Sequence, residues 1–247
     1  MIPRDIRLLE ELTINALPAL QTNVYDGWIL RFAGGYTRRA NSVNALYAGD
    51  LPPEAKIEGC ETSYARNGLP TIFKLTSTPA HQQIDALLEA RGYAHESGAS
   101  VQIHDLTGMP TPPGQAVFQT TISAEWLAAF FRLNQVAAEN QTLLAQMLRM
   151  IQPALCQAAI YDGETAAAVA LGVLQDGHLG IYDVVTDPLR RGRGFARALM
   201  LHLLHWGKAQ GAHTAYLQVV EENTPAINLY AGLGFKPRYT YWYRARR

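Results

Sequence analysis

The sequence has few cysteines and no long apolar run. Its two cysteines, Cys60 and Cys156, stand far apart and form neither the paired spacing of a metal site nor that of a redox motif. We therefore expect no bound metal and a reduced, cytoplasmic protein. No apolar run is long enough to cross a membrane, and residues 1–7 lack the apolar region of a signal peptide. These absences disfavour disulfide-stabilised, secreted and membrane-spanning proteins.

An excess of charge of one sign is also missing. The chain has 21 Lys and Arg against 21 Asp and Glu, so its formal net charge is +0 at pH 7. Basic residues gather only in residues 190–197 and in the last few positions. Proteins that bind nucleic acid usually show a stronger basic footprint. We expect a small-molecule partner, neither nucleic acid nor a membrane, and a monomer or a homodimer.

The composition is that of a globular protein. Apolar residues make up 48% of the 247 positions, which suffices for a core, and the length allows one large domain or two ordinary ones. Apolar periodicity and turn signals predict the elements. Helices are expected over 3–17, 52–67, 78–91, from 123, 141–151, 195–209 and 225–232. Strands are expected over 24–32 around Asp26-Gly27, then 42–47, 71–75, 99–106, 116–120, 156–161, 166–174, 179–186, 215–220 and 235–243. Asp162-Gly163 and Asp176-Gly177 stand between apolar runs and predict hairpin turns.

Residues 184–199 carry the clearest chemical signal. An apolar strand breaks at Asp187-Pro188, passes a basic turn with Gly192 and Gly194, and enters a helical segment. A helix N-terminus offers unpaired N–H groups and a partial positive charge, and glycines let an anion approach the backbone. The stretch predicts a cradle for a phosphate or pyrophosphate. A basic loop that only caps an ordinary helix is the alternative.

Two common phosphate loops do not fit this stretch. No Gly-Lys-Ser/Thr is present, so the loop is not that of a nucleotide-hydrolysing enzyme. No third glycine follows Gly194 at the dinucleotide-binding spacing, and no acidic residue stands where a ribose needs one.

The pattern that does fit is Arg/Gln-x-x-Gly-x-Gly/Ala, with residues 191–196 reading Arg-Gly-Arg-Gly-Phe-Ala. A second signature follows at residues 223–235, where an Asn closes a strand, a helix carries Ala and Leu-Tyr, and Gly-Phe opens the last strand. With both signatures in this order, residues 115–243 resemble the GNAT superfamily of acetyl-CoA-dependent N-acetyltransferases. The resemblance implies an α/β fold, a mixed and mostly antiparallel sheet flanked by helices.

The resemblance also implies where acetyl-CoA binds. Backbone groups of the strand before the loop would hold the pantetheine arm, the loop would hold the pyrophosphate, and positions of the second signature would lie near the coenzyme. These residues are Val184, Val185, Thr186, Arg191, Gly192, Arg193, Gly194, Phe195, Ala196, Asn223, Asn228 and Tyr230. Asn223 fits equally well as only the cap of the following helix.

The same resemblance implies direct attack of a neutral amine on the thioester, with Tyr230 at the position of the family's general acid. A packing tyrosine is the alternative for Tyr230. The general base stays open among Tyr182, Asp183 and Glu221, because only proton reach in a substrate complex decides it. The resemblance further implies a β-bulge in this strand, which would change which of these side chains share a face.

The first part of the chain echoes the second. Residues 78–93 and 224–235 both place Thr-Pro-Ala before a helix and Gly-aromatic after it. We expect tandem GNAT-like units, a degenerate one over 1–110 and a catalytic one over 115–247, joined by a linker over 107–114. In the first unit, residues 48–54 hold two prolines and two carboxylates where a phosphate loop should be. We expect this unit not to bind coenzyme A.

The sequence says less about which residues bind the acceptor substrate. Arg38, Arg39 and Asn41, on a glycine-rich loop, are candidates for gripping an acceptor's carboxylate or phosphate; a solvated loop is the alternative. His202 and His205 lie three apart on a helix without a third ligand nearby, which favours an ordinary helix face over a metal site.

The predicted function is transfer of the acetyl group of acetyl-CoA to a primary amine of a small molecule or peptide. Two alternatives remain: a non-catalytic acetyl-CoA-binding sensor, and a tandem acyltransferase that uses a larger acyl donor.

Overall fold

A computed structural model describes residues 1–246, and its internal contacts divide them into two compact units. Unit 1 comprises Met1–Val101, Val220–Glu222 and the chain from Arg238 on, and unit 2 comprises Gln102–Val219 and Asn223–Pro237. The sequence-based division into 1–110 and 115–247 differs from this grouping in two places. Residues 102–110 group with unit 2, and Val220–Glu222 and the last strand from Arg238 on group with unit 1.

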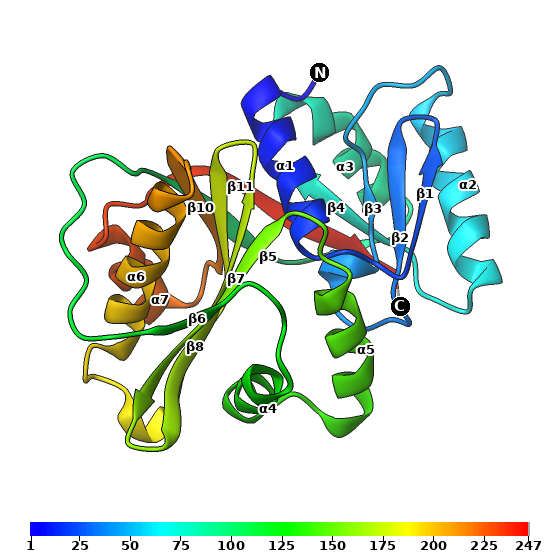
Figure 1. Ribbon diagram of the computed structural model, residues 1–247. Helices are drawn as coiled ribbons and strands as arrows, with labels where there is room; N and C mark the ends of the chain where they lie inside the picture. Colours follow the sequence, from blue (N-terminus) through cyan, green and yellow to red (C-terminus); the bar gives the residue numbers. More distant parts are fainter. Residues whose placement is uncertain (247) are drawn as a thin grey trace. The chain divides into compact units, whose positions relative to one another are not determined.

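Unit 1 has a mixed sheet covered by helices (Figure 1). Its elements are α1 (Arg4–Ala16), β1 (Gln21–Tyr25), β2 (Trp28–Phe32), β3 (Val43–Asn44), α2 (Pro53–Arg66), β4 (Ile72–Thr76), α3 (Gln82–Ala90), the first part of β5 (Ala94–Asp105) and most of β11 (Lys236–Ala245), with 3-10 turns at Arg38–Ala40 and Pro79–His81. Strands β1 and β2 form a hairpin at the expected Asp26-Gly27 turn, where Tyr25 pairs with Trp28.

Strand β11 completes the sheet of unit 1. It runs antiparallel to β4, with Trp242 opposite Leu75 and Arg244 opposite Phe73. Arg244 also donates two hydrogen bonds to the Asp85 carboxylate on α3, at 2.7 and 2.9 Å. Local periodicity predicts that residues 235–243 form a strand, but it carries no information on which neighbour that strand pairs with.

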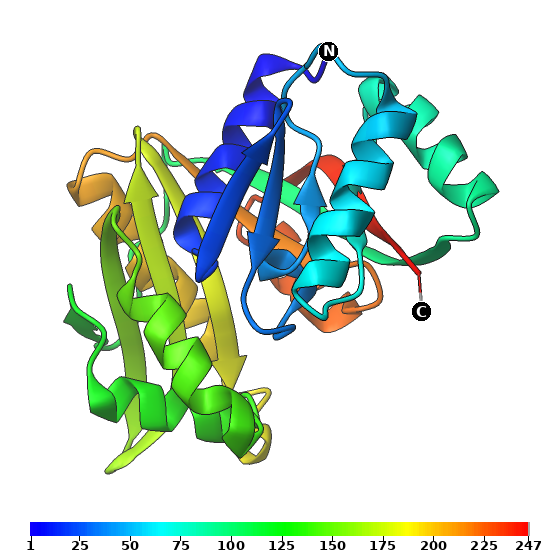
Figure 2. The same ribbon diagram turned by 90° about the vertical axis from the view of Figure 1, so that its right-hand side faces the viewer.

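Unit 2 has a sheet in the order β6-β7-β8-β9-β10. Its elements are β6 (Val117–Gln119), α4 (Ala124–Leu133), α5 (Ala138–Arg149), β7 (Ala154–Asp162), β8 (Thr165–Gln175), β9 (His178–Thr186), a 3-10 turn (Pro188–Arg190), α6 (Phe195–Ala209), β10 (Thr214–Val220) and α7 (Thr224–Ala231). Helices α6 and α7 lie on one face of this sheet and α4 and α5 on the other (Figures 1 and 2).

Both hairpins of unit 2 form at the predicted Asp-Gly turns. Asp162 pairs with Thr165 across the first turn, and Gln175 pairs with His178 across the second. Side chains of α6, among them Leu199 and Leu203, are buried against apolar residues of β7, β8 and β9. The antiparallel meander and the α6 layer together fix the strand end that leads into the 191–196 loop.

Candidate functional site

The 191–196 loop begins with a cap. The carboxylate of Asp187 accepts a hydrogen bond from the backbone N–H of Leu189 at 3.0 Å, which holds the 3-10 turn after β9. Gly192 and Gly194 then adopt left-handed backbone conformations, with φ of 75° and 82°. This cap and the two left-handed residues turn the chain from the strand into α6.

The N-terminus of α6 is open. Gly194 is its N-cap residue and no side chain caps the helix among the described residues. A Cβ atom built on Gly192 or on Gly194 would meet no described atom within 4 Å. Residues 191–194 are exposed. The first N–H groups of α6 therefore face free space, which is the arrangement that binds an anion.

Two aspartates form ion pairs with arginines at the loop. Asp162, in the β7–β8 turn, accepts from Arg193 at 2.7 Å and from Arg190 at 3.0 Å. The Arg193 and Arg190 hydrogen bonds lower the pKa of Asp162. Arg190 also pairs with Asp187 at 2.6 Å. The guanidinium of Arg193 lies 5.0 Å from the ring centre of Phe195. These contacts fix the backbone of the loop while its N–H groups stay accessible.

A bulge lies in β9 next to this loop, as the resemblance implied. Val185 pairs with Val169 and Tyr182 with Leu171, so two residues of β9 stand opposite Ala170 alone. One of the two, Asp183, has a φ of 54°. A bulge of this kind bends its strand and redirects the side chains beyond it.

Beyond the bulge, β9 and β10 part. Their parallel register runs from His178 and Thr214 to Ile181 and Leu217 and ends there, although both strands continue. No described residue of β10 is in register with Val184, Val185 or Thr186. This side of β9 thus presents a strand edge within unit 2, and a strand edge can pair with an extended ligand chain.

The three candidate bases have different surroundings. Tyr182 is buried and its hydroxyl donates to the Tyr216 hydroxyl at 2.8 Å. Asp183 is half-buried at the bulge. Glu221 is exposed in the turn after β10, and its contacts group it with unit 1. Along a regular strand, successive side chains point to opposite faces. The bulge interrupts this alternation in β9, so the spacing of these residues in the sequence does not tell which face each side chain takes.

Helix α7 carries the second signature. The side chain of Asn223 accepts from the backbone N–H of Ala226 at 3.2 Å and so caps the helix. Asn228 is exposed. Tyr230 is buried, with its ring edge-on to Phe235 at 6.1 Å between centres. Burial raises the pKa of Tyr230, so the phenol keeps its proton at neutral pH.

Unit 1 differs at the corresponding loop. The Asp26 carboxylate accepts hydrogen bonds from the backbone N–H groups of Asp50 at 2.9 Å and Leu51 at 3.0 Å. Lys56, whose side chain is 4% exposed, pairs with the same carboxylate at 3.0 Å. The donors that an external phosphate would need are therefore bound to a carboxylate of the protein itself.

The predicted acceptor residues of unit 1 divide into two kinds. Arg38 and Arg39 line a pocket of this unit. Asn41 is buried, and its side-chain amide is used by the loop: it accepts from the N–H of Ala33 at 2.7 Å and donates to the carbonyl of Tyr36 at 2.6 Å. The Asn41 amide thus holds its own loop, and its contact with an acceptor stays a prediction.

Sequence reasoning missed a cavity in unit 2. A cavity of about 860 Å³ lies between α4 and α5, with Leu127, Phe131, Arg132 and Arg149 among its lining residues. Arg132 connects it to the loop, because its guanidinium reaches the Ala166 carbonyl at 2.9 Å and the Asp187 carboxylate at 3.5 Å. Two amphipathic helices predict such a groove only when their packing on the sheet is known.

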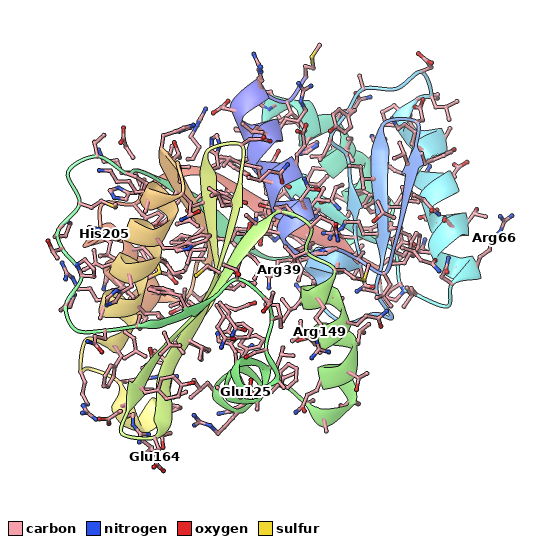
Figure 3. All side chains as sticks on the ribbon, in the orientation of Figure 1. Arg39, Arg66, Glu125, Arg149, Glu164 and His205 are labelled. Carbon is pink, nitrogen blue, oxygen red and sulfur yellow. The ribbon has the colours of Figure 1, made fainter. Side chains whose placement is uncertain are left out.

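The histidine pair of α6 holds the linker. His202 Nε2 lies 3.1 Å from the Pro113 carbonyl oxygen and His205 Nε2 lies 2.9 Å from that of Pro110. Figure 3 labels His205 on this helix. Within residues 1–246, no group of three or more His, Cys, Asp or Glu side chains could hold a metal ion, and no described helix is long and apolar enough to cross a membrane.

Known proteins share this fold across the whole chain. A GCN5-related N-acetyltransferase from Kribbella flavida superposes with a TM-score of 0.71 at 16% identity, over 97% of this chain and 94% of its own. A tandem GNAT protein from the clavulanic acid biosynthesis pathway superposes with a TM-score of 0.63 at 14% identity, over 98% and 95%. The fold, with its bulged β9 and open α6, is that of a GNAT acetyltransferase.

Sequence comparison identifies the protein family. The uncharacterised N-acetyltransferase YobR of Bacillus subtilis is 27% identical over 98% of this chain and 99% of its own length. The family model described as "Probable histone acetyltransferase Rv0428c C-terminal" matches residues 4–244. The chain belongs to this family and is an acyltransferase of the GNAT type.

Proposed function

We propose that this enzyme transfers the acetyl group of acetyl-CoA to a primary amine of a small molecule. The observation that carries the proposal is the uncapped N-terminus of α6 with open space at Gly192 and Gly194. A pyrophosphate needs several N–H donors and room for its oxygens, and this loop supplies both. GNAT acetyltransferases generally use acetyl-CoA, and the loop fits its diphosphate.

The coenzyme would bind along the loop and β9. Backbone N–H groups of residues 191–196 hold the pyrophosphate, and the free edge at Val184–Thr186 pairs with the amide groups of the pantetheine arm. The acyl thioester supplies the activated carbonyl. A backbone N–H beyond the bulge polarises that carbonyl, a contribution of a few kcal/mol in comparable sites.

Two proton transfers complete the proposed reaction. Tyr230, protonated at neutral pH because burial raises its pKa, donates its proton to the departing thiolate. An amine with a pKa near 10 is about one part in a thousand neutral at pH 7, so an acceptor for its proton is needed. Tyr182, Asp183 and Glu221 are the candidate bases. No residue of the chain has to form a covalent acyl intermediate.

We propose that only one of the two GNAT-like domains is catalytic. Residues 115–247 form the catalytic domain and residues 1–110 a degenerate one without a coenzyme. Asp26 supports this, since its carboxylate already binds the N–H groups that a phosphate would use. Both cysteines are buried free thiols, in keeping with a reducing, cytoplasmic location.

An activity screen tests the proposal. Release of free coenzyme A is measured with acetyl-, propionyl-, malonyl- and succinyl-CoA, each against a library of small primary amines and against basic peptides. We expect amine-dependent release with acetyl-CoA as the best donor and a small amine as acceptor. A preference for a larger donor would replace the acetyl assignment. Tight acetyl-CoA binding without turnover for any amine or peptide would favour the sensor.

A further inference from the structure

A pocket of about 540 Å³ lies in unit 1, and it is lined by two of the residues that the sequence offered for an acceptor, Arg38 and Arg39. Its volume is in the usual range for a small-molecule site. The loop after β2, the strands β5 and β11 and the residue Val220 form its walls. The lining residues are Gly35, Thr37, Arg38, Arg39, Gly98, Ala99, Val220, Tyr241 and Tyr243.

The polar groups of the wall are suited to an acceptor ligand. Arg38 and Arg39 can only donate hydrogen bonds, and a tyrosine hydroxyl can donate one. None of the described lining residues is acidic. The remaining walls, at Ala99, Val220 and the tyrosine rings, are apolar and suit a carbon skeleton.

Tyr243 brings an aromatic ring and a cation to the same wall of the pocket. Its side chain is 6% exposed, and its hydroxyl interacts with the side chain of Tyr241. The guanidinium of Arg38 lies 5.6 Å from the centre of the Tyr243 ring. A ligand in this pocket therefore meets an aromatic ring and a guanidinium together.

Arg39 adds positive charge near the pocket, whereas Arg38 and Lys74 are each paired with a carboxylate. Arg38 pairs with Glu96 at 2.8 Å, and buried Lys74 pairs with buried Glu10 at 2.6 Å. Burial lowers the pKa of Arg31 to about 10, and the positive charge of Arg39 contributes to this lowering. The same charge of Arg39 opposes the rise that burial causes in the pKa of Tyr243.

The backbone that carries the arginines is held in place. Arg31 donates from its guanidinium to the carbonyl of Arg39, and Asn41 binds the loop backbone from inside. Thr37 has a φ of 57°, which is costly for a β-branched residue. Strained residues persist where the surroundings fix them, and they cluster at binding sites.

We infer that this pocket binds the carboxylate of a small organic molecule. A planar carboxylate matches the donor fork of a guanidinium. The pairing of Arg38 with Glu96 limits the positive charge available, which suits a single carboxylate better than a doubly charged phosphate. The apolar walls would contact the carbon chain behind the carboxylate.

Calorimetric titration with defined probes tests the inference. The probes are succinate, glutarate and L-glutamate, with glutaramide as the neutral analogue and inorganic phosphate as the competing anion. Variants Arg39→Gln and Tyr243→Phe remove one donor each. Arg66→Gln, on α2 of the same unit and outside the pocket lining, removes the same charge elsewhere; Figure 3 labels Arg39 and Arg66.

We expect saturable binding of at least one carboxylate at millimolar concentration and weaker binding of glutaramide. Arg39→Gln should weaken the carboxylate by about tenfold or more, the usual effect of one charged hydrogen bond, and Arg66→Gln should leave it unchanged. Tyr243→Phe keeps the ring, so it tests the hydroxyl even if Arg39→Gln does not fold. The inference would be overturned if no carboxylate bound saturably or if phosphate bound more tightly than the carboxylates. It would also be overturned if Arg39→Gln and Arg66→Gln had equal effects. Acetyl-CoA affinity, measured on the same variants, reports separately on the proposed acetyl transfer.

Discussion

The carboxylate of Asp26 accepts a hydrogen bond from the backbone N–H of Asp50 at 2.9 Å. This bond closes the loop of unit 1 that corresponds to the open loop of unit 2 before α6. In unit 2 the N–H groups at Gly194 and beyond have no side-chain cap among the described residues. The two loops thus differ in whether the anion site is filled by the protein or left open.

The first prediction is a stoichiometry of one acetyl-CoA per chain. Two prolines and a bound carboxylate leave the unit 1 loop without donors for a pyrophosphate. Calorimetric titration should give one site for wild type. Asp26→Asn should also give one site, because the prolines remain. A stoichiometry of two would contradict the prediction.

The second prediction concerns Gly194→Asp, which should abolish acetyl-CoA binding in a folded protein. The new side chain enters the space at the α6 N-terminus, and its carboxylate repels a pyrophosphate. Gly211→Asp is the matched control, since Gly211 also has a positive φ and open surroundings but follows the C-terminal end of α6. We expect the control to lose some thermal stability and to keep its affinity. Equal affinities of the two variants would remove the loop from the coenzyme site.

The third prediction concerns Tyr230→Phe. The ring packing against Phe235 is kept and only the hydroxyl is lost. Acetyl-CoA affinity should stay within a few-fold of wild type, and kcat and kcat/KM should fall together by roughly ten- to a thousand-fold, toward the usual range for a lost acid–base group. Tyr47→Phe, at an exposed tyrosine of unit 1, is the control. A raised KM with unchanged kcat would make Tyr230 a binding or packing residue.

The fourth prediction is a loss of stability in acid that depends on Asp85. Its carboxylate accepts from Arg244 at 2.7 Å and from Trp242 at 2.8 Å, and these bonds, Arg244 first, lower its pKa. A lowered pKa in the folded state means that the contribution is full above the ordinary aspartate pKa of about 4. It is lost as the pH falls through the lower, folded value.

Thermal unfolding across the acid range measures this effect. Asp85→Asn should be less stable than wild type at pH 7, by about 1–2 kcal/mol, and should lose less stability on acidification. Glu164→Gln, in the exposed β7–β8 turn, should follow the wild-type curve. If the stability of wild type and of Asp85→Asn fell in parallel as the pH is lowered, the Asp85–Arg244 ion pair would not be the cause of the loss of stability in acid.

The sequence predicted the local features well because local chemistry determines them. The turn at Asp176-Gly177 is an example, since only residues that tolerate positive φ suit such hairpins. The loop at Gly192 and Gly194 was found for the same reason. The bulge at Asp183 came from family resemblance, because nothing in the local residues requires it.

Features that depend on distant contacts were not predictable. The pairing of β11 with β4 depends on which strand edge is free after folding. The use of the Asn41 amide by its own loop depends on how the backbone of residues 33–37 curves around it. The linker carbonyls at His202 and His205 are reached only once residues 107–114 lie along α6. In each case the contact forms only in the folded chain, so a short stretch of sequence does not reveal it.

The placement of β11 has a consequence for the order in which the chain folds during its synthesis. Residues 1–101 of unit 1 are synthesised before unit 2, yet the sheet of unit 1 includes β11, most of which is synthesised after unit 2. The segment that becomes β4 must therefore wait, with one edge unsatisfied, until residues 236–245 emerge. Nascent chains halted before that point should expose this edge, and with it a tendency to aggregate that the finished protein lacks.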